Sequence, residues 1–536
     1  MNNADLIVRC LHRAGIRHGF GIPSGNVLPL MEAMRVGGID FVLTAHEGSA
    51  GFAADVTGRQ TGVPGLAIAT LGPGATNLAT GVGDAYLDRS PMLALTCNIN
   101  TDQLGRRIQM SIDHHALFAP ISKGSFALRP GSIAKTLGEA IALSLSEPMG
   151  PVHLDLPEDV AVAEVSEPEE PIEGWLPSVT PLGHAGPEAL AEAARRLAGA
   201  QRPVAVIGAS AMRLGTLDVL TDFIEAHELP FATTTMAKGL VDERHPLSVG
   251  CIERGKRQLQ RQFLADADLV VGVGYDTIEV EYEAWVGDRP VLQLDIEPVD
   301  VAASVDVVHE VVGDLGHTLR ELAESGTQRN WARAVCATHR AEFQDALRPA
   351  STSFCPHQAI DVVREALPDN GILAFDVGAH THQIASQWFA YGPKQFLITN
   401  GWSSMGFGLP AAIAAKVAAP ELPVVCVLGD GCFQMTCGEL ATAKRLGLGL
   451  PIVVLDDQWL GLIKVKQERR GLVHYGTELD VVAPPGPPAH YFGVPAYGAT
   501  DPDALAAELA AAFARSGPTV IEALVDPTHY SETVFD

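Results

Sequence analysis

The chain has 536 residues, of which 47% are hydrophobic and 19% are charged, and its formal net charge is −27. This length exceeds what one hydrophobic core organises and predicts about three or four domains. The composition excludes a disordered chain, and the strong negative charge argues against nucleic acids and anionic membrane surfaces as partners.

The start of the chain and its apolar runs give no sign of secretion or membrane insertion. Met1–Asp5 contains no basic start followed by an apolar stretch. Apolar runs such as Leu269–Val273 and Pro451–Leu455 are far shorter than the roughly 20 residues of a membrane helix. The eight cysteines lack paired metal-type spacing and are expected to be reduced thiols, which predicts a cytoplasmic protein.

Short apolar runs alternate with Ala-rich helical stretches from one end of the chain to the other. The predicted strands are Gly65–Thr70, Met92–Cys97, Val204–Gly208, Leu269–Gly274, Val291–Asp295, Val424–Leu428 and Pro451–Leu455. Because these runs are apolar throughout, they suit parallel strands buried on both faces. Helices such as Pro187–Ala198 and Asp503–Arg515 suit the crossovers between such strands. The predicted fold class is therefore α/β with several parallel sheets.

Two breaks in composition divide the chain into units of similar size. Residues Glu164–Gly186 are rich in Pro, Glu and Gly without a period, and a second polar stretch surrounds Ala346–Pro356. We therefore expect three units, at residues 1–165, 187–340 and 355–536.

In the first unit, Glu47 stands where an apolar strand meets a helix of small residues. A glutamate here could simply favour the helix N-terminus through the helix dipole. A glycine-rich turn, Leu71–Asn77, follows the next predicted strand.

In the third unit, the strand Val424–Leu428 runs into Gly429-Asp430-Gly431, and a helix is expected to follow. Backbone amides at such a helix start bind phosphate, and glycine allows a close approach. A carboxylate there would repel phosphate unless a cation lay between them, so the pattern predicts a divalent ion that bridges Asp430 to a diphosphate. A second ligand is expected at the end of the next strand, where Asp457 lies 27 residues after Asp430.

These residues resemble the thiamine-diphosphate enzymes, whose cofactor motif is Gly-Asp-Gly followed, about 25 to 30 residues later, by Asn-Asn. The chain departs from the motif because Asp456 and Asp457 stand at the Asn-Asn positions. The resemblance implies that Mg²⁺ is held by Asp430, the side chain of Asp457 and the backbone carbonyl of Trp459. Asp is a good hard-oxygen ligand, so the departure need not weaken metal binding.

The same resemblance implies roles for further residues. Glu47 matches the glutamate that activates the cofactor at its aminopyrimidine ring. Met405 matches the bulky residue beneath the cofactor, or it is plain core filler, and the carbonyl of Ser403 would receive the amino group. The cofactor-binding residues implied are Gly72, Asn77, Ala379, His380, Ser403, Met405, Gly429, Gly431, Cys432, Leu460 and Gly461.

The resemblance covers nearly the whole chain and is strongest to acetolactate-synthase-like proteins, as in Gly21–Pro29 and Gln458–Gln467. Gln109 matches a glutamine near the substrate in that group. Lys466 replaces a tryptophan that selects the acceptor, and it either favours an acidic acceptor or is a surface lysine. His114 and His115 are similar to the paired histidines of 2-oxo acid decarboxylases. They are catalytic candidates, because a histidine that touches the substrate could donate a proton.

The resemblance implies a pyrimidine-binding domain, a central Rossmann-like domain and a diphosphate-binding domain in the three units. It implies a carboligase acting on a 2-oxo acid such as pyruvate, working as a homodimer or homotetramer with active sites between subunits. Alternatives are a non-oxidative 2-oxo acid decarboxylase, a flavin-linked 2-oxo acid oxidase and a non-enzymatic cofactor-binding relative. The segment Val270–Glu279 resembles the flavin-free synthases, so we expect no FAD.

Overall fold

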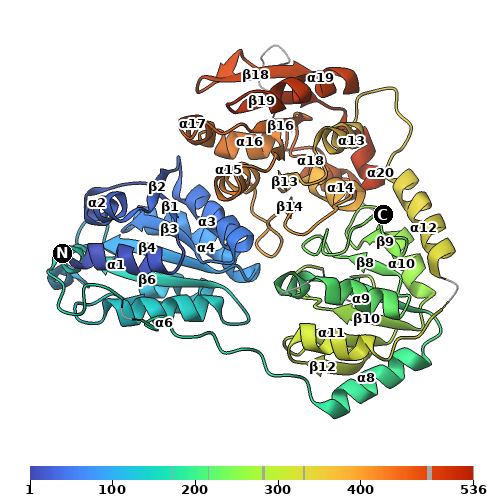
Figure 1. Ribbon diagram of the computed structural model, residues 1–536. Coiled ribbons are helices and arrows are strands. Elements are labelled where there is room, and N and C mark those ends of the chain that lie inside the picture. Colours follow the sequence, from blue (N-terminus) through green and yellow to red (C-terminus); the bar gives the residue numbers. More distant parts are fainter. Residues whose placement is uncertain (172, 215–216, 281–283, 330–331, 480–485, 535–536) are drawn as a thin grey trace.

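The computed structural model describes residues 1–171, 173–214, 217–280, 284–329, 332–479 and 486–534. It contains three separate sheets, each within one of the three parts of the chain (Figure 1). The predicted α/β class with parallel sheets is confirmed. In its described residues the stretch Glu164–Gly186 forms no helix or strand, and it links the first sheet to helix α8.

The first sheet has the strand order β2-β1-β3-β4-β6-β5, with every pair parallel. Its strands are β1 (His18–Gly21), β2 (Asp40–Leu43), β3 (Gly65–Thr70), β4 (Met92–Asn98), β5 (Gly124–Ala127) and β6 (Pro151–Pro157). Its helices are α1 (Asn3–Arg13), α2 (Leu28–Gly37), α3 (Glu47–Thr61), α4 (Pro73–Leu87), α5 (His114–Phe118), α6 (Ile133–Leu145) and α7 (Glu158–Val162). Strands β4 and β6 are buried along their whole length, as expected where helices cover both faces.

The second sheet has the order β12-β11-β10-β7-β8-β9 and is also parallel throughout. Its strands are β7 (Pro203–Ile207), β8 (Phe231–Thr233), β9 (Ser248–Cys251), β10 (Leu269–Val273), β11 (Val291–Asp295) and β12 (Val307–Val312). Its helices are α8 (Pro187–Gly199), α9 (Asp218–Ala226), α10 (Arg257–Ala265), α11 (Leu315–Ala323) and α12 (Ala332–Ala346). The strand order reverses between β7 and β10, which makes that crevice the switch point of the sheet.

The third sheet has the order β14-β13-β15-β16-β19-β18-β17, with one antiparallel pair, β17 and β18, at its edge. Its strands are β13 (Ile372–Phe375), β14 (Phe396–Leu397), β15 (Val424–Gly429), β16 (Pro451–Asp456), β17 (His490–Tyr491), β18 (Val494–Ala499) and β19 (Thr519–Leu524). Its helices are α13 (Pro356–Ala366), α14 (Ala379–Gln387), α15 (Gly408–Ala418), α16 (Asp430–Thr436), α17 (Glu439–Arg445), α18 (Gly461–Arg469), α19 (Pro502–Phe513) and α20 (Tyr530–Thr533).

The first and third units share one hydrophobic core, although the whole second unit separates them in the sequence. Helix α3 packs against α15, and the rings of Phe52 and Phe407 meet edge to face with 5.7 Å between centroids. Figure 1 shows α3 and α4 of the blue unit facing the orange unit that carries α15 and α16. No helix in the described ranges is long and apolar enough to cross a membrane.

Candidate active site

Glu47 is the first residue of α3, directly after the loop that leaves β2. The Nδ1 atom of His46 caps the helix by accepting the N–H of Gly48 at 3.0 Å. The side-chain amide of Asn77 donates to Oε2 of Glu47 at 3.0 Å. A Cβ on Gly74 would lie 3.3 Å from Oε1 of Glu47, so glycine leaves room beside the other oxygen of this buried carboxyl group. The structure therefore brings together Glu47 and Asn77, two of the predicted site residues.

The glycine-rich turn beside Glu47 meets the loop that carries Gln109. Gly72 has a φ of +60°, and a Cβ there would lie 2.5 Å from the carbonyl oxygen of Met110, so both backbone conformation and space require glycine. The N–H of Gly72 donates to Nε2 of His114 at 3.4 Å. The side chain of Gln109 is exposed next to this contact.

The two predicted metal-binding carboxylates lie at the ends of neighbouring parallel strands, β15 and β16. Asp430 accepts the backbone N–H groups of Gly431 at 2.7 Å and Gln458 at 2.8 Å. Asp457 accepts the N–H of Trp459 at 2.9 Å, across Gln458, whose φ is +63°. This left-handed residue is uncommon outside glycine and marks a tight loop that turns the backbone at Trp459.

Burial and the charge of Asp457 raise the pKa of Asp430 to about 8. Burial also raises the pKa of Asp457 to about 7, with a further contribution from Asp456. Neighbouring carboxyl groups that are buried and repel one another are stabilised by a bound cation. This donor set of hard oxygens suits Mg²⁺.

A cradle of small residues adjoins the two carboxylates. A Cβ on Gly429 would lie 3.1 Å from the His380 ring, and one on Gly431 would lie 2.8 Å from Leu460 and 3.3 Å from the Met405 methyl group. A Cβ on Gly461 would lie 2.8 Å from Oδ2 of Asp457 and 3.7 Å from Ala379. The structure thus gathers the following predicted residues in one place: Ala379, His380, Met405, Gly429, Gly431, Asp457, Leu460 and Gly461.

His380 from this cradle, and two further predicted residues, Cys432 and Ser403, have polar groups with distinct surroundings. His380 is buried, and its Nε2 atom has no hydrogen-bond partner in the described parts of the chain. Burial lowers the pKa of His380 to about 4, so the ring is neutral near pH 7 and can donate or accept one hydrogen bond. The thiol of Cys432 lies 3.0 Å from the carbonyl oxygen of Val377. Ser403 has a φ of +52°, and its hydroxyl donates to the carbonyl oxygen of Asn400 at 2.6 Å.

Two carboxylates that the sequence analysis did not single out hold this site in shape. Asp376 is buried and accepts the N–H groups of Gly406 at 3.0 Å and Gly408 at 2.8 Å, which ties the end of β13 to the loop of Met405. Glu439 on α17 accepts the N–H groups of Ala45 at 2.9 Å and His46 at 3.2 Å. It therefore anchors the loop before Glu47 to the third unit.

The residues near Glu47 and those near Asp430 remain two groups within one chain. Among the described residues, no hydrogen bond joins a side chain of Glu47, Asn77 or His114 to Asp430, Asp457 or His380. The first group contains the predicted site residues of the first unit, and the second group contains those of the third unit.

The two candidate histidines have different surroundings. His114 is buried and lies 3.0 Å from a carboxylate oxygen of Asp155. His115 is half-buried and lies 2.6 Å from the hydroxyl of Ser125. Both line a cavity of about 900 Å³ that extends under the loop of residues 104–113.

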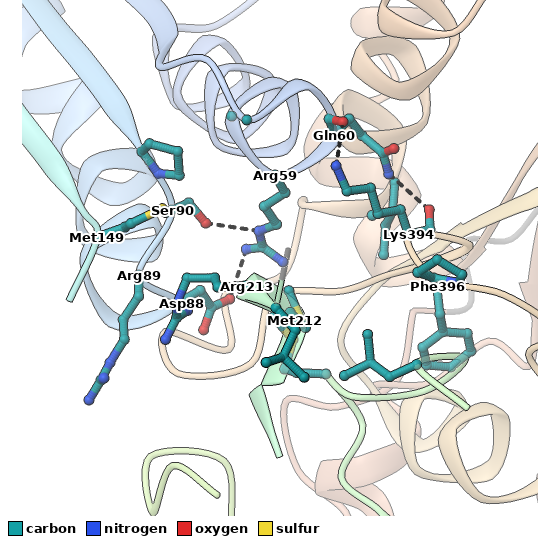
Figure 2. Close-up of a pocket in the computed structure, with 18 of the residues that line it drawn as sticks. Arg59, Gln60, Asp88, Arg89, Ser90, Met149, Met212, Arg213, Lys394 and Phe396 are labelled. Carbon is teal, nitrogen blue, oxygen red and sulfur yellow. Dashed lines mark hydrogen bonds and ion pairs between the residues drawn. The ribbon is translucent and has the colours of Figure 1, made fainter. Parts of the chain in front are cut away.

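A second cavity of about 430 Å³ lies where the three units meet (Figure 2). Arg59 is at its centre, where the guanidinium donates to Asp55, to Asp88 at 2.9 Å, to Ser90 at 3.0 Å and to the carbonyl oxygen of Ile398 at 2.7 Å. The cavity wall contains none of the predicted site residues. Arg59 and Lys394 join the first unit to the third, whereas Arg89 and Arg213 form ion pairs between the first unit and the second.

Three parts of the chain match families of thiamine pyrophosphate enzyme domains. Residues 1–117 match the N-terminal TPP binding domain, residues 190–322 the central domain and residues 376–523 the C-terminal TPP binding domain. A probable acetolactate synthase large subunit from Methanocaldococcus jannaschii is 30% identical, over 98% of this chain and 92% of that protein. The acetolactate synthase large subunit of Parasynechococcus marenigrum is 31% identical over 97% and 87%. Acetolactate synthase isozyme 2 large subunit of Escherichia coli is 31% identical over 87% and 85%.

Proposed function

Because the chain belongs to the family of thiamine pyrophosphate enzymes that includes acetolactate synthase large subunits, we propose that it is a thiamine-diphosphate-dependent carboligase acting on pyruvate. The observation that carries the proposal is the buried Glu47 at the start of α3, with Asn77 bonded to one carboxylate oxygen and Gly74 leaving room beside the other. A protein that only bound the cofactor would not need a carboxylate there.

We propose that Asp430, Asp457 and the backbone carbonyl of Trp459 would hold Mg²⁺, which would offset the negative charge of a bound diphosphate. The raised pKa values of both carboxyl groups support a cation at this position. The unpartnered Nε2 atom of His380 and the glycines 429, 431 and 461 support a diphosphate beside it.

Bound thiamine diphosphate supplies the electron sink that allows a 2-oxo acid to lose CO₂. Glu47 would hold and release a proton at the cofactor's pyrimidine ring, which is an acid–base role. Met405 would support the cofactor from below, and the Asp376 carboxylate fixes the loop that carries it. The loop of Gln109, packed on the Gly72 turn, would cover the reacting groups.

The acceptor is proposed to be a second 2-oxo acid, because Lys466 offers a positive charge to its carboxylate. Lys466 is half-buried on α18 and has no ion-pair partner in the described residues. Burial and the nearby cations Arg254 and Arg470 lower its pKa. A cation in a repulsive setting is stabilised when an anion binds.

The central unit supports a reaction without flavin. At the switch point of its sheet, the carboxylate of Glu279 accepts the N–H of Ala209, directly after β7, at 2.8 Å. A Cβ on Gly208 would lie 2.5 Å from the Cα of Tyr275. The backbone after β7 and the residues after β10 thus pack closely at the switch point where dinucleotides bind in such sheets, which supports the proposal.

We further propose a homodimer or homotetramer whose active sites combine the Glu47 group of one subunit with the Asp430 group of another. Large hydrophobic side chains are exposed beside both groups, at Leu104, Met110 and Ile112 in the first unit and at Trp402 and Met435 in the third. Exposed apolar patches of this kind are typical of subunit contacts. All eight cysteines are free thiols, which supports a reducing compartment such as the cytoplasm.

The test is the product formed from pyruvate with thiamine diphosphate and Mg²⁺, measured as released CO₂ and product mass. Acetolactate is the expected product, whereas acetaldehyde alone would indicate a decarboxylase and no CO₂ would remove pyruvate as donor. Glu47→Ala should lower the rate by roughly 10²–10⁴, the range typical of acid–base groups. A loss of less than about threefold would contradict the role proposed for Glu47.

A further inference from the structure

The adjacent histidines of α5 differ in which ring nitrogen is left for a ligand. In His114, Nδ1 lies 3.0 Å from the Asp155 carboxylate and Nε2 accepts the N–H of Gly72, so both nitrogens are engaged. In His115, Nδ1 lies 2.6 Å from the hydroxyl of Ser125. No protein partner contacts Nε2 of His115 within the described ranges. Only His115 can therefore present a ring nitrogen to the cavity that both residues line.

Ser125 connects His115 to a buried chain of hydrogen bonds that crosses three strands. Its hydroxyl oxygen also lies 2.7 Å from Nδ1 of His153 on β6. The other ring nitrogen of His153, Nε2, lies 2.8 Å from the hydroxyl of Thr96 on β4. A hydroxyl has one hydrogen, so Ser125 must donate to one histidine and accept from the other.

The protonation states and distances favour one direction for this series of hydrogen bonds. Burial lowers the pKa of His153 to about 3, so its ring is neutral and carries one N–H. Although burial acts in the opposite direction, hydrogen bonds and His114 hold the pKa of Asp155 below its usual value, so this carboxylate only accepts.

Thr96 lies 3.3 Å from the nearer Asp155 oxygen, longer than the roughly 2.5–2.7 Å of a hydroxyl that donates to a carboxylate, so we assign its hydrogen to Nε2 of His153 at 2.8 Å. His153 then accepts at Nε2 and donates from Nδ1 to Ser125. Ser125 in turn donates to Nδ1 of His115, which leaves the hydrogen of neutral His115 on Nε2.

The same cluster has the composition of a metal site but not its geometry. Ligand atoms of His114, His153 and Asp155 lie within 4.8 Å of one another. The Thr96 hydroxyl, however, is within 2.9 Å of both rings and 3.3 Å of the carboxylate. The Thr96 hydroxyl therefore occupies the position that a metal ion would take. It satisfies the polar atoms of His114, His153 and Asp155 by hydrogen bonding.

The cavity in front of His115 is lined by three arginines, Arg106, Arg107 and Arg129. All three side chains are exposed, and none forms an ion pair with a carboxylate in the described part of the chain. An anionic ligand would supply the missing partner, and guanidinium groups pair well with carboxylates.

We propose that this cavity binds the carboxylate of a 2-oxo acid, and that Ser125 and His153 are positioning residues that hold His115 with its Nε2–H directed at this ligand. The substrate class rests on the proposed function, whereas the arrangement of His115 does not. His114 is assigned a structural part, as the anchor between Asp155 and the Gly72 turn.

The tautomer of His115 tests the positioning role without any turnover. In full-length protein with ¹⁵N-labelled histidine at about pH 8, where neutral imidazole dominates, NMR shows which ring nitrogen carries hydrogen. Its signal is assigned by its loss in His115→Gln. We expect the Nε2–H form in the wild type and in Ser125→Thr, and a mixture of both forms in Ser125→Ala and His153→Gln. An Nδ1–H form in the wild type, or a tautomer unchanged in both of the last two variants, would overturn the positioning role.

Pyruvate, added to the full chain without cofactor so that no turnover occurs, tests the ligand. A saturable change in the His115 signal is expected, with affinity at least fivefold weaker in Arg129→Gln and unchanged in Arg195→Gln, an exposed arginine of α8. Acetone, which has the ketone but no carboxylate, should produce no change. A wild-type signal that does not respond to pyruvate would refute the binding site. Failure of the proposed carboligation would instead appear only in the product assay.

Discussion

The chemical state of a single residue in this protein depends on its surroundings, and Glu279 is an example. Its carboxyl group accepts the Ala209 N–H at 2.8 Å, directly after β7. Burial raises the pKa of Glu279 from 4.5 to about 8. The Glu279 carboxyl group beside the switch point of the central sheet is therefore protonated in the folded protein at neutral pH.

This raised pKa predicts a specific dependence of stability on pH. Between pH 4.5 and 8 the folded chain binds a proton that the unfolded chain has lost, so stability due to Glu279 falls as the pH rises through this window. Glu279→Gln has the shape of the protonated side chain and does not titrate. We expect the variant to equal the wild type near pH 5 and to exceed its stability by about 1–3 kcal/mol at pH 9.

Urea denaturation at several pH values measures this difference. Glu365→Gln, at an exposed position of α13, is the matched control and should show no such trend. A difference that stays constant with pH would contradict the assigned protonation of Glu279.

At the scale of elements, the crossing of α3 and α4 sets the geometry around Glu47. The helices touch at Gly51 and Gly81, where a Cβ on Gly81 would lie 2.5 Å from the Cα of Gly51. Glu47 and Asn77 each lie four residues before the crossing, about one turn along their helices. The 3.0 Å hydrogen bond between them depends on this close approach.

Gly81→Ala should therefore affect both stability and the site. Its methyl group meets backbone atoms that cannot rotate away, so we expect a loss of about 1–3 kcal/mol in unfolding free energy. Separation of the helices should also weaken thiamine diphosphate binding, measured by calorimetry. In Gly199→Ala, at the open end of α8, nothing lies within 4 Å of the added carbon, and stability should stay equal or rise. If Gly81→Ala and the wild type had equal denaturation midpoints, α3 and α4 would tolerate separation and the predicted loss of stability would be wrong.

The same scale shows what could be predicted from the sequence. Apolar runs such as Val424–Leu428 and Pro451–Leu455 predicted strands to within one residue, because burial on both faces leaves a continuous signal. Strand β14, with two residues, is too short to leave such a pattern. Asp430 and Asp457 were found together because neighbouring parallel strands end at one edge of a sheet.

Residues that stabilise the site through contacts between distant parts of the sequence could not be predicted from apolar runs or motifs. Glu439 lies 394 residues from its partner Ala45. Ser125 and His153 come to His115 only through the pairing of β5 with β6. No local period or motif marks these contacts, because they depend on how separate units pack. The boundaries of the three units and the roles of the site residues stay predictions.

At the scale of the whole molecule, the arrangement of the units bears on how an active site is completed. Arg59 and the shared core hold the first and third units together within one chain. The Glu47 group and the Asp430 group are nevertheless not joined by hydrogen bonds in the described residues. Exposed apolar side chains flank both groups, including Met110 and Met435. This pattern favours completion of each site by a second subunit.

Mixing two inactive variants tests this arrangement. Glu47→Gln damages the first-unit half of a site, and Asp430→Asn damages the third-unit half. If each site combines two chains, a mixed dimer has one site with both lesions and one intact site. Random reassembly should then restore about a quarter of wild-type activity, because half of the dimers are mixed and half of their sites are intact. If each site lies within one chain, every chain carries one lesion and mixing restores nothing. Each variant reassembled alone is the control, and sedimentation of the mixture establishes that dimers have formed, so that absence of restored activity would refute the shared site.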